Sequence, residues 1–110
     1  MASRPEDGRI DWNWPARRIF NLVRGVTHPY PGAFCFANGR KMLIWEARIA
    51  EEEGKPAESG RIVRSVGSAI EVATGNGTIL LLRSQLEGEP EIEALTALSR
   101  ANLPIMQRLE

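Results

Sequence analysis

The chain has 110 residues, of which 43% are hydrophobic and 25% are charged, a composition typical of one folded domain with a single core. This length excludes a two-domain enzyme. The 14 basic and 14 acidic residues cancel, which argues against a strongly basic nucleic-acid-binding surface over the whole domain. The charge is uneven along the chain, because residues 1–48 hold eight Arg or Lys and four Asp or Glu, whereas residues 49–110 hold six and ten.

The sequence carries no membrane, disulfide or catalytic signature. No apolar run approaches the length of a bilayer span, and the N-terminus is polar, so we expect a cytoplasmic protein without a membrane partner. The single cysteine, Cys35, has no second thiol to pair with, and its neighbours Phe34 and Phe36 indicate a core position. Because no nucleophile–base or metal-ligand motif is present, we assign no catalytic residue and no metal site.

An amphipathic helix is predicted from Pro15 to about Thr27. Its apolar residues recur at i, i+3, i+4 and i+7, which is the pattern of a helix with one buried face. Proline suits the first turn of a helix, where its missing N–H leaves no intrahelical bond unmade. The helix cannot run far beyond Thr27, because prolines follow it closely.

A short Pro-rich loop follows this helix and contains the only His and the only Tyr of the chain. We interpret it as a rigid corner that leads from the helix into the first strand. The corner consists of His28, Pro29, Tyr30, Pro31 and Gly32. His28 has no partner that would make it a general base.

Five strands and a short C-terminal helix are predicted after the corner. The first strand pair flanks Asn38-Gly39, a dipeptide that favours a tight type I′ hairpin turn. Residues 51–60 are charged and contain Gly and Pro, so they form a solvated loop. A helix is expected between Pro90 and Pro104, where apolar residues repeat every three positions, starting at Ile92. The predicted strands are Ala33–Ala37, Arg40–Ile49, Arg61–Val66, Ala69–Thr74 and Thr78–Leu86. Short strands at this spacing suggest a small barrel.

Basic residues of the first half are candidates for a phosphate-binding surface, with Trp12, Trp14 or Tyr30 available for stacking. The candidates are Arg17, Arg18, Arg24, Arg40 and Lys41. Solvated surface charges beside half-buried aromatic rings are the other interpretation of the same residues.

Four blocks of the sequence carry a family resemblance over about residues 5–108. In chain order they read GRIDWNWPARRIFNLVRGVTHPYPGAF, NGRKMLIWEARI, SGRIV and SAIEVATGNGTILLL. This set resembles the C-terminal domain of the 10-formyltetrahydrofolate-dependent formyltransferases. That family includes methionyl-tRNA formyltransferase and UDP-4-amino-4-deoxy-arabinose formyltransferase.

The resemblance implies a mainly β fold, a small open OB-like β-barrel of five or six strands with an N-terminal helix and a short C-terminal helix. It also implies that residues 1–110 are one domain of a longer enzyme, in which an N-terminal Rossmann-like domain binds 10-formyltetrahydrofolate and carries the catalytic residues. We therefore expect this domain to bind no cofactor and to be inactive alone. Leu109-Glu110 can be read as a cloning remnant.

Two branches of the family suggest two roles. Four residues separate Arg24 from the PYPGAF segment, a spacing that resembles the amino-sugar branch, in which the barrel would support the catalytic domain and its cleft. In the alternative, the methionyl-tRNA branch, Arg17, Arg18, Arg40 and Lys41 would contact transfer RNA. A third hypothesis is an independent single-stranded nucleic-acid binder, which requires exposed aromatic rings on neighbouring strands.

Overall fold

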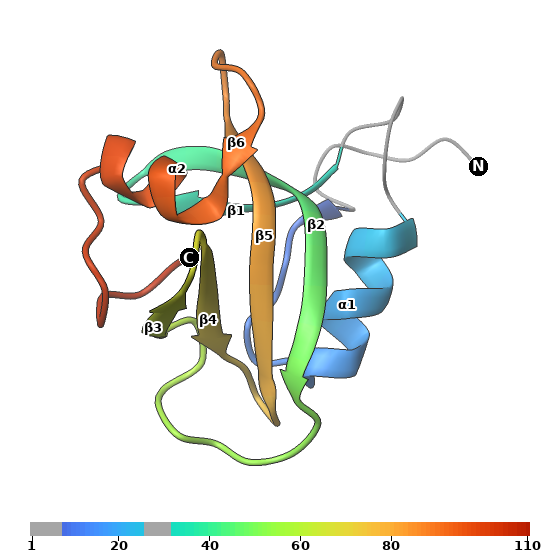
Figure 1. Cartoon of the computed structure of the whole chain (residues 1–110). Coiled ribbons are helices and arrows are strands. Elements are labelled where there is room, and N and C mark those ends of the chain that lie inside the picture. The colour runs from blue at the N-terminus through green and yellow to red at the C-terminus, as the bar shows by residue number, and fades with distance from the viewer. Residues whose placement is uncertain (1–7, 26–31) are drawn as a thin grey trace.

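The computed structural model describes residues 8–25 and 32–110, which form one antiparallel sheet with two helices (Figure 1). The elements in chain order are α1 (Ala16–Gly25), β1 (Ala33–Ala37), β2 (Arg40–Glu51), β3 (Ile62–Val66), β4 (Ala69–Ala73), β5 (Thr78–Leu86), β6 (Ile92–Glu93) and α2 (Ala94–Arg100). The strand order is β1-β2-β5-β4-β3, and β6 pairs with β5. The mainly β fold with an N-terminal and a short C-terminal helix is therefore confirmed.

Helix α1 begins directly after Pro15, as predicted, and buries one face. Ile19 is 0% exposed and Val23 is 2% exposed, so the apolar stripe of the sequence is the face that packs on the core. The Ala16 N–H donates to the Asn76 carbonyl at 2.8 Å, which fixes the first turn of the helix on the β4–β5 turn.

Beside this contact, the backbone of the β4–β5 turn lies against the backbone of the segment before α1. The Gly75 N–H donates to the Trp14 carbonyl at 3.0 Å, and a Cβ added at Gly75 would lie 1.8 Å from the carbonyl oxygen of Asn13. Only glycine fits at this position, because any side chain would overlap backbone atoms. The β4–β5 turn and the segment before α1 are thereby held together.

The β1–β2 hairpin has the predicted turn. Ala37 pairs with Arg40, and the two residues between them have positive φ, 51° at Asn38 and 82° at Gly39. Positive φ at both central residues defines a type I′ turn, whose twist matches that of the flanking strands.

The sheet stays open between its two edge strands. Within the described residues no ladder joins β1 to β3. The C-terminal segment lies between them, because the Met106 N–H donates to the Ile62 carbonyl at 2.8 Å and the Glu110 N–H donates to the Phe36 carbonyl at 2.9 Å. The predicted open architecture is thus observed, whereas the OB-like description remains a prediction.

The core lies inside the curved sheet and includes the predicted Cys35, which is 0% exposed. Leu109, next to the last residue, is 1% exposed and belongs to the same hydrophobic cluster. No helix among the described residues combines the length and apolarity needed to cross a membrane.

The short C-terminal helix is confirmed, but Ile92, the first residue of the apolar repeat that predicts it, lies outside the helix. Ile92 and Glu93 form β6, in register with Ser84 and Arg83 of β5, and α2 starts at Ala94. A three-residue apolar repeat does not exclude a short strand, and the end of β5 that extends beyond its pairing with β4 decides between the two.

Of the predicted corner, His28, Pro29, Tyr30 and Pro31 lie outside the described residues. Gly32 is described and packs against Trp45, because a Cβ added at Gly32 would lie 3.2 Å from the indole ring. The rigid corner therefore remains a prediction.

Candidate functional site

Helix α1 carries three arginines and no acidic residue. Its sequence ARRIFNLVRG places Arg17 and Arg18 in the first turn and Arg24 in the last. All three are exposed, whereas Ile19 and Val23 of the same helix are buried. The exposed part of α1 is therefore positively charged, on a domain whose formal net charge is zero.

Aromatic rings lie beneath these arginines. The guanidinium carbon of Arg18 lies 4.0 Å from the ring centroid of Trp14. Those of Arg17 and Arg24 lie 5.8 and 5.6 Å from the ring of Phe20. A guanidinium stacked on a ring gains a cation–π attraction and keeps its in-plane N–H donors available for an oxygen ligand. We call Arg17, Arg18 and Arg24, with Trp14 and Phe20, the α1 arginine face.

The three arginines differ in their partners. Arg17 forms an ion pair with Glu52, in which both side chains are 56% exposed. Neither Arg18 nor Arg24 has an ion pair with a carboxylate in the described parts of the chain. Arg18 and Arg24 are therefore the two guanidinium groups of this face with donors to spare for an anionic partner.

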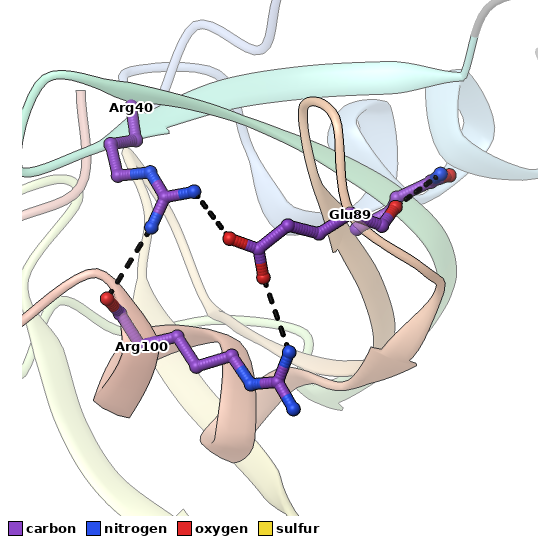
Figure 2. A network of polar contacts seen from close by, with 4 residues as sticks. Arg40, Glu89 and Arg100 are labelled. Atoms are coloured by element: carbon purple, nitrogen blue, oxygen red, sulfur yellow. Dashed lines mark hydrogen bonds and ion pairs between the residues drawn. The ribbon is translucent and has the colours of Figure 1, made fainter.

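Arg40 is placed differently, within a polar network at the other end of β2 (Figure 2). Its Nη2 lies 2.6 Å from Glu89 Oε2, and its Nη1 donates to the Arg100 carbonyl at 3.4 Å. Arg100 in turn donates from Nη1 to Glu89 Oε1 at 3.2 Å. The hydrogen bond from Arg40, followed by that from Arg100, lowers the pKa of the Glu89 carboxyl below its ordinary value. The network joins the β1–β2 hairpin, the β5–β6 loop and the end of α2.

Lys41 lies over the outer side of β1. Arg9, which the sequence did not suggest as a site residue, lies on the same side. The Lys41 ammonium is 4.4 Å from the ring centroid of Phe34 and 4.0 Å from Glu87 Oε2. Arg9, which bridges to Phe34 through the backbone, places its guanidinium 4.8 Å from the ring of Phe36. No periodicity or motif could have shown that residue 9 pairs with β1.

The structure does not gather the four predicted contact residues into one site. Arg17 and Arg18 lie at the start of α1, where Arg17 reaches Glu52 just beyond the end of β2. Arg40 and Lys41 begin β2, so a strand of twelve residues separates the two pairs. Sequence reasoning missed Phe20 as the shared platform of Arg17 and Arg24, although i, i+3 and i, i+4 spacing on a helix predicts such neighbours.

The remaining predictions concern aromatic exposure and metals. Phe34 is 6% exposed and lies under Lys41, whereas Phe36 and Trp45 are half-buried, so the strands present no open row of rings for single-stranded bases. Among the residues that the structure describes, no group of three or more His, Cys, Asp or Glu side chains could hold a metal ion.

The family model and the similar sequences both indicate the formyltransferases. Residues 3–102 match the model of the formyl transferase C-terminal domain. Methionyl-tRNA formyltransferase of Lactococcus lactis subsp. cremoris is 39% identical over 99 residues, which are 86% of this chain and 30% of that protein. The protein of the same name from Anaeromyxobacter dehalogenans is 47% identical over 92 residues, 82% of this chain and 29% of its own length.

A solved structure shares the fold. HypX from Aquifex aeolicus in complex with tetrahydrofolic acid superimposes with a TM-score of 0.76 and 17% identity, over 94% of this chain and 18% of that one. The chain thus spans about a third or less of the proteins it matches. Since the relatives named above are methionyl-tRNA formyltransferases, they favour the transfer-RNA alternative over the amino-sugar interpretation of the PYPGAF spacing.

Proposed function

Because the chain belongs to the formyl transferase C-terminal domain family, we propose that it is the part of a methionyl-tRNA formyltransferase that holds transfer RNA. The observation that carries this proposal is the α1 arginine face, an acid-free helix whose guanidinium groups lie near aromatic rings, in a chain 37–47% identical to proteins of that name. The amino-sugar role needs no such surface, since a nucleotide sugar is small enough to be held by the catalytic domain.

The proposed contribution is positioning. Arg18 and Arg24 donate hydrogen bonds to phosphate oxygens of the transfer RNA, and these contacts fix its orientation without reading its sequence. The longer enzyme then supplies 10-formyltetrahydrofolate and the catalytic groups, and the methionyl amine is formylated there. Holding the amine near the formyl donor converts an encounter of two molecules into a reaction within one complex, which is a large part of many rate enhancements. The 110-residue chain itself catalyses nothing in this proposal.

The test is a titration of the 110-residue chain with methionyl-tRNA, followed by two-dimensional NMR at low and at near-physiological salt. We expect shifts of backbone amides clustered on α1 that weaken steeply as salt rises, because phosphate contacts release counterions. Arg18→Ala and Arg24→Ala should each weaken binding about tenfold, or about 1.4 kcal/mol.

Arg83→Ala is the matched control. Arg83 is half-buried and already paired with Glu91 at 3.1 Å and Glu93 at 3.7 Å, so its removal takes away the same charge without a free donor. If Arg83→Ala weakened binding as much as Arg24→Ala, net charge rather than the α1 arginine face would be responsible. If no localised shifts appeared even at low salt, this result would contradict transfer-RNA binding and favour the amino-sugar interpretation.

A further inference from the structure

The loop between β2 and β3 brings an acidic residue to the α1 arginine face. Glu52, the first residue after β2, forms an ion pair with Arg17 in the first turn of α1, across 35 residues of sequence. Figure 1 shows the end of β2 beside the start of α1, which makes this contact possible. Of the three arginines of the face, Arg17 is the one that meets a carboxylate of the described residues.

Backbone contacts hold this part of the loop in place. The Gly77 N–H donates to the Gly54 carbonyl at 2.6 Å, and the Gly54 N–H donates to Asn76 Oδ1 at 2.9 Å. A Cβ added at Gly77 would lie 2.3 Å from the carbonyl oxygen of Glu51 and 2.8 Å from that of Glu52, so the loop backbone lies directly on the glycine. The same β4–β5 turn binds the first turn of α1. The loop and the helix therefore share one support, and Glu52 stays beside the helix.

The ion pair is of the kind that another anion can replace. Both side chains are 56% exposed, and an exposed ion pair contributes little to stability because water screens it. A guanidinium binds phosphate as well as carboxylate, through two parallel N–H···O hydrogen bonds. A phosphate that approaches the α1 arginine face therefore competes with Glu52 for the same donors of Arg17.

A structural role for Glu52 exists as well. Helix α1 has no acidic residue in its first turn, and a negative charge near the N-terminus of a helix is favourable. Glu52 supplies such a charge from a different element. Because removal of this charge can lower the stability of α1, the affinity for RNA and the thermal stability must be measured separately.

We propose that Glu52 is an intramolecular competitor of transfer-RNA phosphate for Arg17, an inference that rests on the proposed function. On binding, the guanidinium leaves the carboxylate and donates to a phosphate oxygen, and the carboxylate returns to water. Formylation changes only the methionyl amine, so substrate and product present the same phosphates to this domain. A competitor that takes Arg17 back lowers the affinity for both and favours release of the product.

Glu52→Gln tests the proposal by filter binding of methionyl-tRNA to the 110-residue chain. Glutamine keeps the shape of the side chain and removes its charge, so we expect the affinity to rise about three- to fivefold. In the Arg17→Ala background, the same substitution should change the affinity by no more than about 1.5-fold, because the contested donor is gone. Thermal unfolding of each variant reports any separate loss of stability.

Glu53→Gln is the matched control. Glu53 is exposed, lies next to Glu52 and forms no ion pair with the described residues, so its replacement removes the same charge without freeing Arg17. We expect its affinity to change by no more than about 1.5-fold. An equal rise in Glu53→Gln, or a full rise in the Arg17→Ala background, overturns the proposal, because negative charge in general is then responsible. An unchanged or lower affinity of Glu52→Gln also overturns it.

A second measurement needs no substitution and so avoids any disturbance of α1. The carboxyl ¹³C signal of Glu52 should shift in step with the α1 amides during the titration with methionyl-tRNA, and that of Glu53 should stay nearly constant. A constant Glu52 signal while the α1 amides shift contradicts competition. Weaker binding of Arg18→Ala and Arg24→Ala together with no effect of Glu52→Gln contradicts the competitor alone. Unchanged binding of both arginine variants contradicts the proposed function itself.

Discussion

The two arginine groups of this domain share a residue type but differ in surroundings. On α1, Arg18 and Arg24 rest on aromatic rings and pair with no carboxylate of the described residues. At the start of β2, Arg40 shares Glu89 with Arg100. Neutralisation by a carboxylate leaves a guanidinium few donors for a phosphate, whereas stacking on a ring leaves them available. The availability of guanidinium N–H donors, rather than the number of basic residues, distinguishes a binding surface from a structural ion-pair network.

Charge reversal on α1 should have the largest effect on affinity for transfer RNA. Arg18→Glu combined with Arg24→Glu replaces two attractions to phosphate by two repulsions, so we expect affinity for transfer RNA to fall by about a hundredfold or more. Filter binding at low salt measures this loss. The comparison pair Arg40→Ala with Arg100→Ala removes two positive charges without reversing them and should change affinity by no more than about threefold; an equal loss in both double variants would show that the two arginine groups contribute alike.

Removal of the ring beneath Arg18 should lower the affinity for transfer RNA by a smaller factor. Trp14→Leu keeps an apolar side chain but deletes the indole 4.0 Å from the guanidinium. An exposed cation–π contact contributes about 0.5–1 kcal/mol, so we expect a two- to fivefold loss of affinity. Filter binding repeated in the Arg18→Ala background should show almost no further loss of affinity from Trp14→Leu. A full additional loss would show that the ring acts independently of Arg18.

Neutralisation of Glu89 has the smallest expected effect on binding and a distinctive effect on acid stability. The pKa of Glu89 is lowered in the folded protein, so its stabilising contribution is present above the unfolded pKa and is lost as pH falls through the folded one. Glu89→Gln should therefore reduce stability at pH 7 and flatten its decline below about pH 4.5, as measured by thermal unfolding. Binding of transfer RNA should rise by no more than about twofold. An unchanged acid profile would show that the network does not depend on this charge.

Most of the fold could be predicted from local chemistry. Pro15 marks the start of α1, Asn38-Gly39 marks the hairpin, and all predicted strand boundaries agree within two residues, because turns and breakers act over short distances. Strand β6 was missed, since its two residues form a strand only through pairing with β5. The closure of the edges by the C-terminal segment was missed for the same reason, as it depends on partners far away in the chain.

The candidate site was less predictable than the fold. The sequence identifies the basic residues, and Phe20 could have been placed beside Arg17 and Arg24 from helical spacing. It does not show that Glu89, 49 residues from Arg40, takes that guanidinium, or that Arg17 meets Glu52 across 35 residues. Contacts of this length follow from the topology of the sheet, so the division into available and occupied arginines needed the three-dimensional structure.

The C-terminal segment between β1 and β3 affects the order in which we expect the chain to fold. It joins residue 106 to residue 62 and residue 110 to residue 36. Because these bonds close large loops, we expect them to form late in folding. Until they form, the edges of β1 and β3 expose unpaired backbone groups to other chains. Refolding at high concentration is therefore where we expect this domain to aggregate, and the native state, once the segment is in place, is protected from the same fate.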